Sequence, residues 1–470
     1  MAVKYDLIII GAGPGGYTAA VKAASFGFRV AVIERDKLGG VCINRGCIPT
    51  KALLHASSIF SMMQHSDEFG VSTDFISFDF GKMQDYKKRS VKRYRSEIEN
   101  LFEKNGIDYI KGIATIRRGK TVEVNSESGK EYYQADHIII ATGAKPRKPD
   151  IPGIDLPGVG NSDRLLSVPS WNYDRVVIMG GGVIGVEFAT IFQALCSKVT
   201  IVEKGPHLLG PMDEEVAAAL KKQLTDKGIT IYCNSIVDEI TESEGLNCHI
   251  RHLETGKTSL VKATQVVTAV GRIPHMEDLF GEDVRLNIEQ GRLAVNSDFE
   301  TSEPGIYAIG DVVADTQLAH VAMAQATYVV ENIAGRRHTI RLEAVPNGMY
   351  VSLPIVPNCI YTDPEIATVG ITEQAALDLG MKVRCGVYDM GRNGKSIIAR
   401  EENGFIRLVF ESYSNTIVGA QMVCPRATDM IGELATAIAN GLTAEQLSMA
   451  MRAHPTYSEG IGAAIADAMR

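Results

Sequence analysis

Two cysteines separated by four residues are the first feature of this sequence that could do chemistry. Cys42 and Cys47 lie in the stretch from residue 39 to residue 51, which reads GGVCINRGCIPTK. A straight helix would hold the two Cα atoms about 7.5 Å apart along its axis, whereas a disulfide needs them within about 7 Å. The chain must therefore bend if the sulfurs are to bond, and Gly46 lacks the Cβ that would oppose a bend. The alternative is two unrelated core residues, because free cysteine is often buried.

Two glycine-rich sequences share one pattern. Each follows an apolar segment, at residues 7–10 and 176–179, and each leads to a second apolar segment, at 30–33 and 199–202. Glu34 and Glu203 end these second segments, each 23 positions after the first glycine of its copy. The glycines concerned are Gly11, Gly13 and Gly16 in the first copy and Gly180, Gly182 and Gly185 in the second. One alternative is a glycine-rich turn in some other α/β unit, but the repeated order and spacing favour two dinucleotide-binding sites.

The residue types explain why a dinucleotide would bind there. The glycines permit a tight turn and a close approach of the backbone to a pyrophosphate, whose charge then meets a helix N-terminus. The glutamate accepts hydrogen bonds from ribose hydroxyls. Glu203 favours NAD over NADP, because a carboxylate repels a 2′-phosphate. Lys204 follows it as a cation that would weaken this repulsion.

Three further apolar segments end in residues that would face a ligand. Residues 138–143 and 266–271 both read as buried strands that end in Ala-x-Gly, and they are expected to complete the two nucleotide domains. The segment 306–311 ends in Asp311, which should lie in a ligand-facing loop at the edge of a sheet. The candidate residues of this group are Thr142, Gly143, Gly271 and Asp311.

The order of these segments predicts the domain organisation. We expect an α/β fold with two Rossmann-like dinucleotide-binding domains, the first at residues 1–150 and 275–348 and the second at 151–274. Short alternating strands, such as 405–410, and a helical pattern at 430–440 predict a C-terminal α+β domain at 349–470. The 470 residues, 45% of them hydrophobic, suffice for about three cores.

Dithiol exchange needs a base, because the thiolate is the nucleophile. His454 is a candidate, since Glu459 lies five residues further on and could hold one ring nitrogen and raise the basicity of the imidazole. The alternative is an ordinary solvated histidine near the end of the chain.

Composition argues against several classes of partner. The net charge of −8 predicts neither nucleic acid nor an anionic membrane as a partner. The sequence has no apolar run of membrane-spanning length and no signal-peptide layout at the N-terminus, so we expect a soluble, cytoplasmic protein. The other six of its eight cysteines fall in no metal-ligand spacing, which predicts neither a zinc site nor a disulfide scaffold.

Two dinucleotide sites and a dithiol in one chain indicate an electron relay. The first fingerprint adjoins the cysteines and should hold the flavin, as FAD, because the thiolate must reach it. The second fingerprint should then hold NAD. The cysteine pair would exchange electrons with a dithiol or disulfide substrate.

The chain resembles the flavoprotein disulfide reductases from end to end, and within them the branch that oxidises dihydrolipoamide. The resemblance rests on the cysteine motif, the first glycine fingerprint, the segments ending at Gly143 and Asp311, and the sequence from His454 to Glu459. It implies that Cys42 is the interchange thiol and Cys47 the thiol nearest the flavin. His454 and Glu459 would form an acid–base dyad supplied by the partner subunit of an obligate homodimer.

The same resemblance implies roles for other residues and a partner. Lys51 would pair with Glu187 near the flavin, Glu34 would bind the adenosine ribose of FAD, and Asp311 its ribityl chain. The implied partner is a lipoyl-bearing multienzyme complex of the 2-oxoacid dehydrogenase type or a related one. The implied reaction is NAD-dependent oxidation of protein-bound dihydrolipoamide.

Two departures from that branch leave the substrate open. Arg452 stands where a second histidine is usual, and His275 stands where an asparagine is usual. One alternative is a related reductase that acts on another small or protein-bound disulfide. Another is a flavoprotein scaffold or regulator with weak catalysis, against which the intact cysteine and histidine motifs argue.

Overall fold

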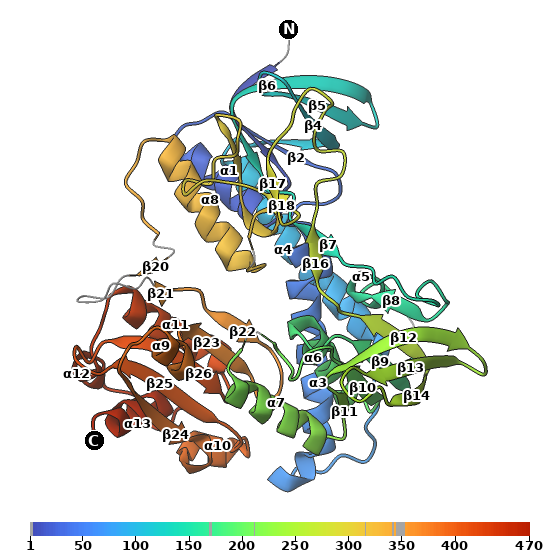
Figure 1. Cartoon of the computed structure of the whole chain (residues 1–470), viewed down its shortest axis with the longest axis vertical. Helices are drawn as coiled ribbons and strands as arrows, with labels where there is room; N and C mark the ends of the chain where they lie inside the picture. The colour runs from blue at the N-terminus through green and yellow to red at the C-terminus, as the bar shows by residue number, and fades with distance from the viewer. Residues whose placement is uncertain (1–2, 169–171, 211, 315, 341–342, 345–352) are drawn as a thin grey trace.

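The computed structural model describes residues 3–168, 172–210, 212–314, 316–340, 343–344 and 353–470. Figure 1 shows an upper part built on the N-terminal sheet and a lower part that contains a second sheet and a C-terminal sheet. The predicted fold class, two α/β units and a C-terminal α+β unit, is confirmed.

The first sheet has strand order β3-β2-β1-β6-β5-β4, and β19 also pairs with β6. Its central strand β1 pairs in parallel with β2 on one side and β6 on the other. Leu7 and Ile9 point into one core and Ile8 and Ile10 into another, as the period of two along a doubly buried strand requires. The strands are β1 Val3–Ile10, β2 Val30–Glu34, β3 Asp108–Lys111, β4 Ile113–Arg117, β5 Thr121–Ser126, β6 Gly129–Ile140 and β19 Ile306–Ala308.

Helices cover this sheet, and the first glycine fingerprint lies at the start of one of them. Helix α1 packs beside α8 on one face (Figure 1). The first turn of α1 follows β1, so the first glycine fingerprint lies at the carboxyl end of that strand. The helices of this part are α1 Pro14–Ser25, α2 Gly40–Arg45, α3 Cys47–Gln64, α4 Phe80–Lys104 and α8 Ala319–Ile333.

The second sheet repeats the arrangement of the first. Its order is β11-β10-β9-β15-β8, with every pairing parallel and β9 between β10 and β15. The strands are β8 Val159–Asn161, β9 Arg175–Met179, β10 Lys198–Val202, β11 Thr230–Tyr232 and β15 Gln265–Thr268; the helices are α5 Ser162–Leu165, α6 Val183–Ala194 and α7 Glu214–Asp226. An antiparallel sheet joins it, made of β12 Ser235–Glu242, β13 Leu246–His252 and β14 Thr258–Ala263.

The C-terminal sheet is antiparallel, in the order β22-β23-β26-β25-β24. Helices α11 and α13 pack against it, which gives the predicted α+β unit its own apolar core. The strands are β22 Asn358–Ile360, β23 Ile366–Gly370, β24 Val383–Asp389, β25 Phe405–Glu411 and β26 Ile417–Val423; the helices are α9 Glu373–Asp378, α10 Gly394–Ala399, α11 Ala427–Ala439, α12 Ala444–Ser448 and α13 Glu459–Ala468.

The remaining elements are short. Strand β7 Ala144–Pro146 pairs with β16 Arg272–Pro274 and ties together the two crossings between the nucleotide-binding units. The others are β17 Ile288–Glu289, β18 Arg292–Leu293, β20 Glu343–Ala344, β21 Leu353–Pro354, and the short 3₁₀ helices Ser66–Phe69, Gly310–Val312 and Met390–Arg392. Within the described ranges, no helix is both long enough and apolar enough to cross a membrane.

Helix α3 connects the two nucleotide-binding units. It starts at Cys47 beside the first fingerprint and packs against α6 of the second unit. Leu53 and Phe60 of α3 share one buried core with Phe188 of α6. The cysteine motif therefore lies between the two glycine fingerprints.

The predicted domain limits near residues 150 and 274 remain predictions. The strand β19 returns to the first sheet after the second sheet is complete, as a split first domain would require. The predicted limit between residues 348 and 349 lies outside the described residues.

Candidate active site

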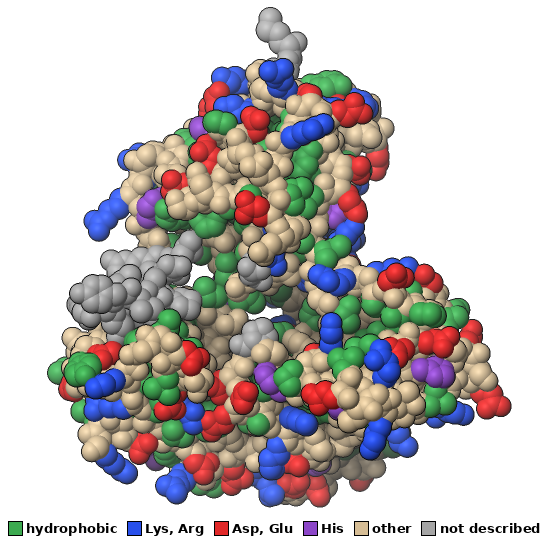
Figure 2. Space-filling view, viewed as in Figure 1, with side chains coloured by type: hydrophobic (Ala, Val, Ile, Leu, Met, Phe, Trp, Pro, Cys, Tyr) green, Lys and Arg blue, Asp and Glu red, His purple; other side chains and the backbone are tan. Residues whose placement is uncertain are grey.

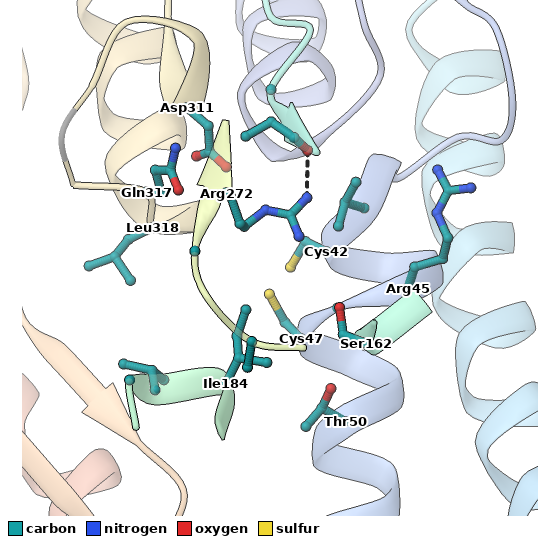
Figure 3. Close-up of a pocket in the computed structure, with 18 of the residues that line it drawn as sticks. Cys42, Arg45, Cys47, Thr50, Ser162, Ile184, Arg272, Asp311, Gln317 and Leu318 are labelled. Atoms are coloured by element: carbon teal, nitrogen blue, oxygen red, sulfur yellow. Dashed lines mark hydrogen bonds between the residues drawn. The ribbon is translucent and has the colours of Figure 1, made fainter. Parts of the chain in front are cut away.

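The two cysteines lie on either side of a break between helices. Helix α2 ends at Arg45 and α3 begins at Cys47, so the chain bends at Gly46 as the spacing predicts. A Cβ on Gly46 would lie 3.1 Å from the Val41 carbonyl oxygen and 3.3 Å from the Cys42 Cα, a tight fit for any other residue. The two side chains are free thiols joined by a hydrogen bond, and Figure 3 shows their sulfur atoms next to each other.

The surroundings shift the pKa values of the two thiols in opposite directions. The hydrogen bond from Cys42 lowers the pKa of Cys47, and the positive charge of Lys51 adds to that effect against the opposing effect of burial. The same hydrogen bond, together with burial, raises the pKa of Cys42. When the pair is reduced, Cys47 is therefore the thiol that carries the negative charge.

One cavity of about 1120 Å³ contains the dithiol and both glycine fingerprints. The molecular surface is hollowed between the upper and lower parts of the molecule (Figure 2). The predicted residues that line this cavity are Gly11, Gly13, Glu34, Cys42, Cys47, Lys51, Thr142, Gly143, Gly180, Gly182, Glu187, Glu203, Gly271 and Asp311. Gly16, Gly185, His454 and Glu459 are the predicted site residues that do not line it.

The two fingerprints have matching geometry. Gly11 and Gly180 have φ values of +101° and +106°, and a Cβ on either would lie 2.4 Å from a carbonyl oxygen, that of Ala141 or Ala269. The turn at each first glycine therefore packs against the backbone at the start of an Ala-x-Gly segment. Gly16 and Gly185 are needed for helix packing, since a Cβ there would lie 1.9 Å and 2.0 Å from the carbonyl oxygens of Gly11 and Gly180.

The glutamates at the ends of β2 and β10 also match. Glu34 accepts hydrogen bonds from the backbone N–H groups of Ala12, at 2.8 Å, and Asp36, at 2.9 Å. Glu203 accepts from Gly181 and Gly205, at 2.6 Å each. Each carboxylate is therefore held at the cavity wall with oxygen lone pairs left for a ribose. Lys204 also lines the cavity, beside Glu203.

Polar groups mark the end of the cavity near Asp311. The buried Thr142 hydroxyl has no hydrogen-bond partner among the described residues. Burial raises the pKa of Asp311, against the opposing charge of Arg272. Such groups, next to a positive-φ Gly143, fit a polar ligand such as a flavin dinucleotide.

Lys51 and Glu187 form an ion pair inside the cavity. The Lys51 Nζ lies 2.8 Å and 2.7 Å from the two carboxylate oxygens of Glu187, which is almost fully buried. The C-terminal unit supports this pair: the Tyr361 N–H donates to Glu187 at 3.2 Å, and the Lys51 Nζ lies 4.6 Å from the centre of the Tyr361 ring. The sequence analysis missed Tyr361, because no spacing links residue 361 to a motif near residue 50.

Arg272 is a second residue that the sequence analysis missed. Its guanidinium donates to the Ala144 carbonyl and lies between Asp311 and the dithiol (Figure 3). Burial lowers the pKa of Arg272, although Asp311 opposes the shift. The sequence could have indicated Arg272, since it follows Gly271 at the end of a predicted ligand-facing strand.

His275, one of the two departures noted above, is buried and contacts Arg35 through its Nε2 atom. Burial lowers the pKa of His275, and the Arg35 cation adds to that effect, so the ring is neutral and accepts the arginine N–H. Arg35 lines the cavity next to Glu34. His275 therefore orients a cation beside the first fingerprint.

His454 and Glu459 form a pair away from the cavity. The His454 Nδ1 lies 2.8 Å from Glu459, and the histidine side chain is 78% exposed. The N–H of Thr456 and the His454 ring lower the pKa of Glu459. Helix α13, which starts at Glu459, lies at the lower left of Figure 1, far from α1. Within one chain the dyad therefore does not reach the dithiol.

Comparison with known proteins identifies the class. Residues 5–326 match the family model described as pyridine nucleotide-disulphide oxidoreductase, and residues 356–465 match the dimerisation domain of that family. The chain belongs to the pyridine nucleotide-disulphide oxidoreductases, a family of flavoprotein oxidoreductases, so it is an oxidoreductase with FAD and NAD(H) as its cofactors, and the resemblance stated from the sequence is confirmed. The dimerisation domain supports a homodimer.

Individual relatives agree with this assignment. The chain is 35% identical over 464 residues to a dihydrolipoyl dehydrogenase of Geobacillus stearothermophilus, covering 97% of this chain and 95% of that one. A structure of the HOCl-induced flavoprotein disulfide reductase RclA from Escherichia coli, solved as a Cu(II) complex, is 27% identical with a TM-score of 0.85, covering 98% and 99% of the two chains. LpdA of Mycobacterium tuberculosis shares the fold, at 23% identity, a TM-score of 0.88 and 99% coverage of both chains.

Proposed function

We propose that this protein oxidises dihydrolipoamide, carried on a protein, with NAD as the final electron acceptor. The observation that carries the proposal is the Cys42/Cys47 pair in one cavity with two dinucleotide fingerprints. The 35% identity to a dihydrolipoyl dehydrogenase over nearly the whole chain supports the choice of substrate.

The cysteines exchange a disulfide with the substrate. A substrate thiolate attacks Sγ of Cys42 in the oxidised pair, the Cys42–Cys47 bond breaks, and Cys47 leaves as a thiolate. The second substrate thiol loses its proton and attacks the substrate sulfur in the mixed disulfide, which releases Cys42 and a cyclic substrate disulfide. The substrate loses two electrons and two protons. The cysteine pair gains the two electrons, Cys42 gains one of the protons because its pKa is raised, and the base takes the other proton while Cys47 stays a thiolate. The lowered pKa of Cys47 suits it as the leaving thiolate.

The remaining cavity residues hold the cofactors. Gly11, Gly13, Gly16 and Glu34, with Thr142, Gly143 and Asp311, would hold FAD. Gly180, Gly182, Gly185, Glu203 and Gly271 would hold NAD. A flavin held by the first set would supply two-electron transfer between the dithiol and the nicotinamide nucleotide held by the second set. Lys51, fixed by Glu187, would place a cation beside the flavin and stabilise the Cys47 thiolate.

His454 and Glu459 would act from the partner subunit of the homodimer. The imidazole would take the substrate proton, and Glu459 would hold the opposite ring nitrogen. The exposure of His454 supports this proposal, since the ring is free to enter a neighbouring subunit.

We also propose a lipoyl-bearing multienzyme complex as the partner and the cytoplasm as the compartment. Free thiols such as the exposed Cys196 are typical of a reducing compartment. Cell fractionation, with a search for the protein in membrane and periplasmic fractions, tests the compartment. Co-purification with a lipoylated protein tests the complex.

The decisive experiment measures NADH formation by the purified holoenzyme from NAD and dihydrolipoamide. We expect rapid turnover that Cys42→Ser abolishes. If turnover is negligible while NADH-dependent reduction of another disulfide is fast, that disulfide replaces dihydrolipoamide as the proposed substrate. The 27% identity to RclA keeps that second candidate open.

A scaffold with weak catalysis is tested separately. Anaerobic NADH titration should produce a long-wavelength absorbance band from the Cys47 thiolate, and the band should be absent in Cys47→Ser. If the unaltered protein gives no band, the electron relay itself is wrong.

A further inference from the structure

Helix α4 presents a concentrated positive charge on a chain whose net charge is −8. Five exposed cations lie on it within twelve residues: Lys82, Lys88, Arg89, Lys92 and Arg93. We call this set the α4 basic face. On the face drawn in Figure 2, by contrast, acidic and basic side chains are intermixed. The cluster is visible in the sequence, since residues 87–95 read KKRSVKRYR. The expectation drawn from the net charge alone missed it, because a sum over the chain cancels local charge.

The basic face is opposite the packed side of the helix. Gln84, Ile98 and Phe102 are buried, and at 100° per residue they fall on one arc of α4 while the five cations fall on another. Lys88 pairs with Asp85 at 3.2 Å. Arg89, Lys92 and Arg93 have no carboxylate partner among the described residues.

The spacing of these charges works against helix stability. Lys88 and Lys92, and likewise Arg89 and Arg93, are four residues apart, where like charges repel each other. Opposite charges at these positions would stabilise the helix instead. Asp85 and Glu97 lie four residues from Arg89 and Arg93 and offset part of this repulsion. An anionic partner bound to the four cations would offset the rest.

Helix α4 connects this charge to the dithiol. The Tyr94 side chain is exposed on α4, and its hydroxyl hydrogen-bonds the hydroxyl of the half-buried Tyr17 of α1. Burial raises the pKa of Tyr17, and Tyr94, Cys42 and Cys47 add to that shift, which places the dithiol close to Tyr17. Helix α4 also contacts α2, which carries Cys42, and Ile98 packs in the same core as Cys42.

We propose that the α4 basic face docks an acidic carrier domain that presents its dithiol to Cys42. This inference rests on the function proposed above. The cations from Lys82 to Arg93 extend about 16 Å along the helix, which is longer than a small dithiol and suits the surface of a folded domain. The set ends at Arg93, whose neighbour Tyr94 contacts Tyr17 near the dithiol. This position favours a carrier of the substrate over a nucleic acid or a membrane.

The kinetic test uses the holoenzyme and two substrates. The triple variant Arg89→Gln/Lys92→Gln/Arg93→Gln is compared with a control that removes three exposed lysines from the second unit, Lys221→Gln/Lys257→Gln/Lys262→Gln. At low ionic strength we expect kcat/KM for an acidic dihydrolipoyl domain to fall at least about tenfold in the first variant only. For free, uncharged dihydrolipoamide kcat/KM should change less than about twofold in both variants. Equal losses on both substrates, or no loss on the domain, would overturn the proposal.

A binding test separates this proposal from the proposed function. The holoenzyme is titrated with the acidic lipoyl domain without its lipoyl group, and with a version whose surface carboxylates are changed to amides. We expect tighter binding of the acidic version, weakened by salt and by the triple α4 variant. Binding that does not depend on these charges overturns docking at the α4 basic face, even if dihydrolipoamide is oxidised. Tighter binding of duplex DNA or anionic vesicles through the same three residues would also overturn it. If the charge-dependent binding is found but dihydrolipoamide is not oxidised, docking stands and the substrate assignment fails.

Discussion

Arg452 and Glu433 form an ion pair that attaches the segment carrying His454 to α11. The Arg452 Nη2 lies 2.5 Å from the Glu433 carboxylate, and the arginine side chain is only 11% exposed. The Arg452 Nη1 also donates to the Ala450 carbonyl at 3.3 Å. Its methylene chain packs on Gly462 of α13, where a Cβ would lie 3.3 Å from the Arg452 Cδ. Arg452 therefore acts as a positioning residue for the loop that ends in His454.

Replacing Arg452 should displace the His454 loop without loss of FAD. We expect Arg452→Ala to lower turnover with dihydrolipoamide by at least about tenfold, since a shift of ~1 Å costs up to about a hundredfold. The pH profile of kcat/KM should shift as well, which a loss of stability alone would not cause. Glu433→Gln should produce a smaller loss of the same kind. An Arg452→Ala enzyme with an unchanged pH profile and turnover would show that the ion pair is only structural.

Mixed dimers should test whether His454 acts across the subunit interface. Cys42→Ser and His454→Gln homodimers should both be inactive. A heterodimer of the two variants, purified with two different affinity tags, should regain about half of the normal activity, because one of its two sites has an intact cysteine pair and an intact histidine. If the histidine acts within its own chain, both sites of the heterodimer are damaged and it stays inactive.

The reduced protein should become more stable as the pH rises toward the ordinary thiol pKa of 9.0. The folded pKa of Cys47 is lowered, so between that value and the unfolded pKa the unfolded chain binds more protons. The stabilisation is present above the unfolded pKa and is lost as the pH falls through the folded pKa. Denaturant unfolding of the reduced protein at a series of pH values measures this slope.

Lys51→Met supplies the matched variant for that pH dependence. Without the Lys51 cation the pKa of Cys47 should rise, and thiolate absorbance should appear at higher pH than in the unaltered protein. Cys47→Ser should remove the low-pH ionisation altogether. An ionisation that persists in Cys47→Ser would assign the thiolate to a different cysteine.

Glu203 should control the choice between NAD and NADP. Glu203→Arg replaces an anion at the ribose site with a cation, and the ratio of kcat/KM for NADP to that for NAD should rise about 10- to 100-fold, the equivalent of ~1.5–3 kcal/mol for a hydrogen bond to a charged group. Glu203→Gln keeps the shape and removes the charge, so its ratio should rise less. Initial-rate assays with each nucleotide measure the ratio. An unchanged ratio in both variants would place the ribose elsewhere.

Two glycines of the second fingerprint should respond differently to alanine. At Gly185 a Cβ would lie 2.0 Å from the Gly180 carbonyl oxygen, so Gly185→Ala should destabilise the second unit by about 1–3 kcal/mol or more. At Gly182 a Cβ meets no atom within 4 Å, so Gly182→Ala should fold normally and bind NADH more weakly, because it blocks the pyrophosphate. Thermal unfolding and NADH fluorescence titration distinguish the two effects. Equal stability of the two variants would contradict the packing role of Gly185.

Local patterns in the sequence were sufficient to predict both nucleotide-binding units. The order of strand, glycine turn, helix and acidic residue reflects backbone sterics and hydrogen bonds over about 25 residues, so it can be read without the fold. The bend at Gly46 and the Lys51–Glu187 pair are likewise found where the sequence and the family resemblance expected them. The roles of these residues in catalysis remain predictions.

The tertiary structure decided which distant residues share the cavity. Tyr361 supports Glu187, and His275 orients Arg35, across sequence separations of 174 and 240 residues that no local pattern encodes. Such contacts depend on how whole sheets and helices pack, and packing follows from the shapes of many buried side chains together. The same packing separates His454 from the cysteines of its own chain and leaves one charged face of α4 in solvent. The sequence by itself therefore determined the cysteine pair and the two dinucleotide fingerprints. Only the packing of the three units decided how these motifs come together.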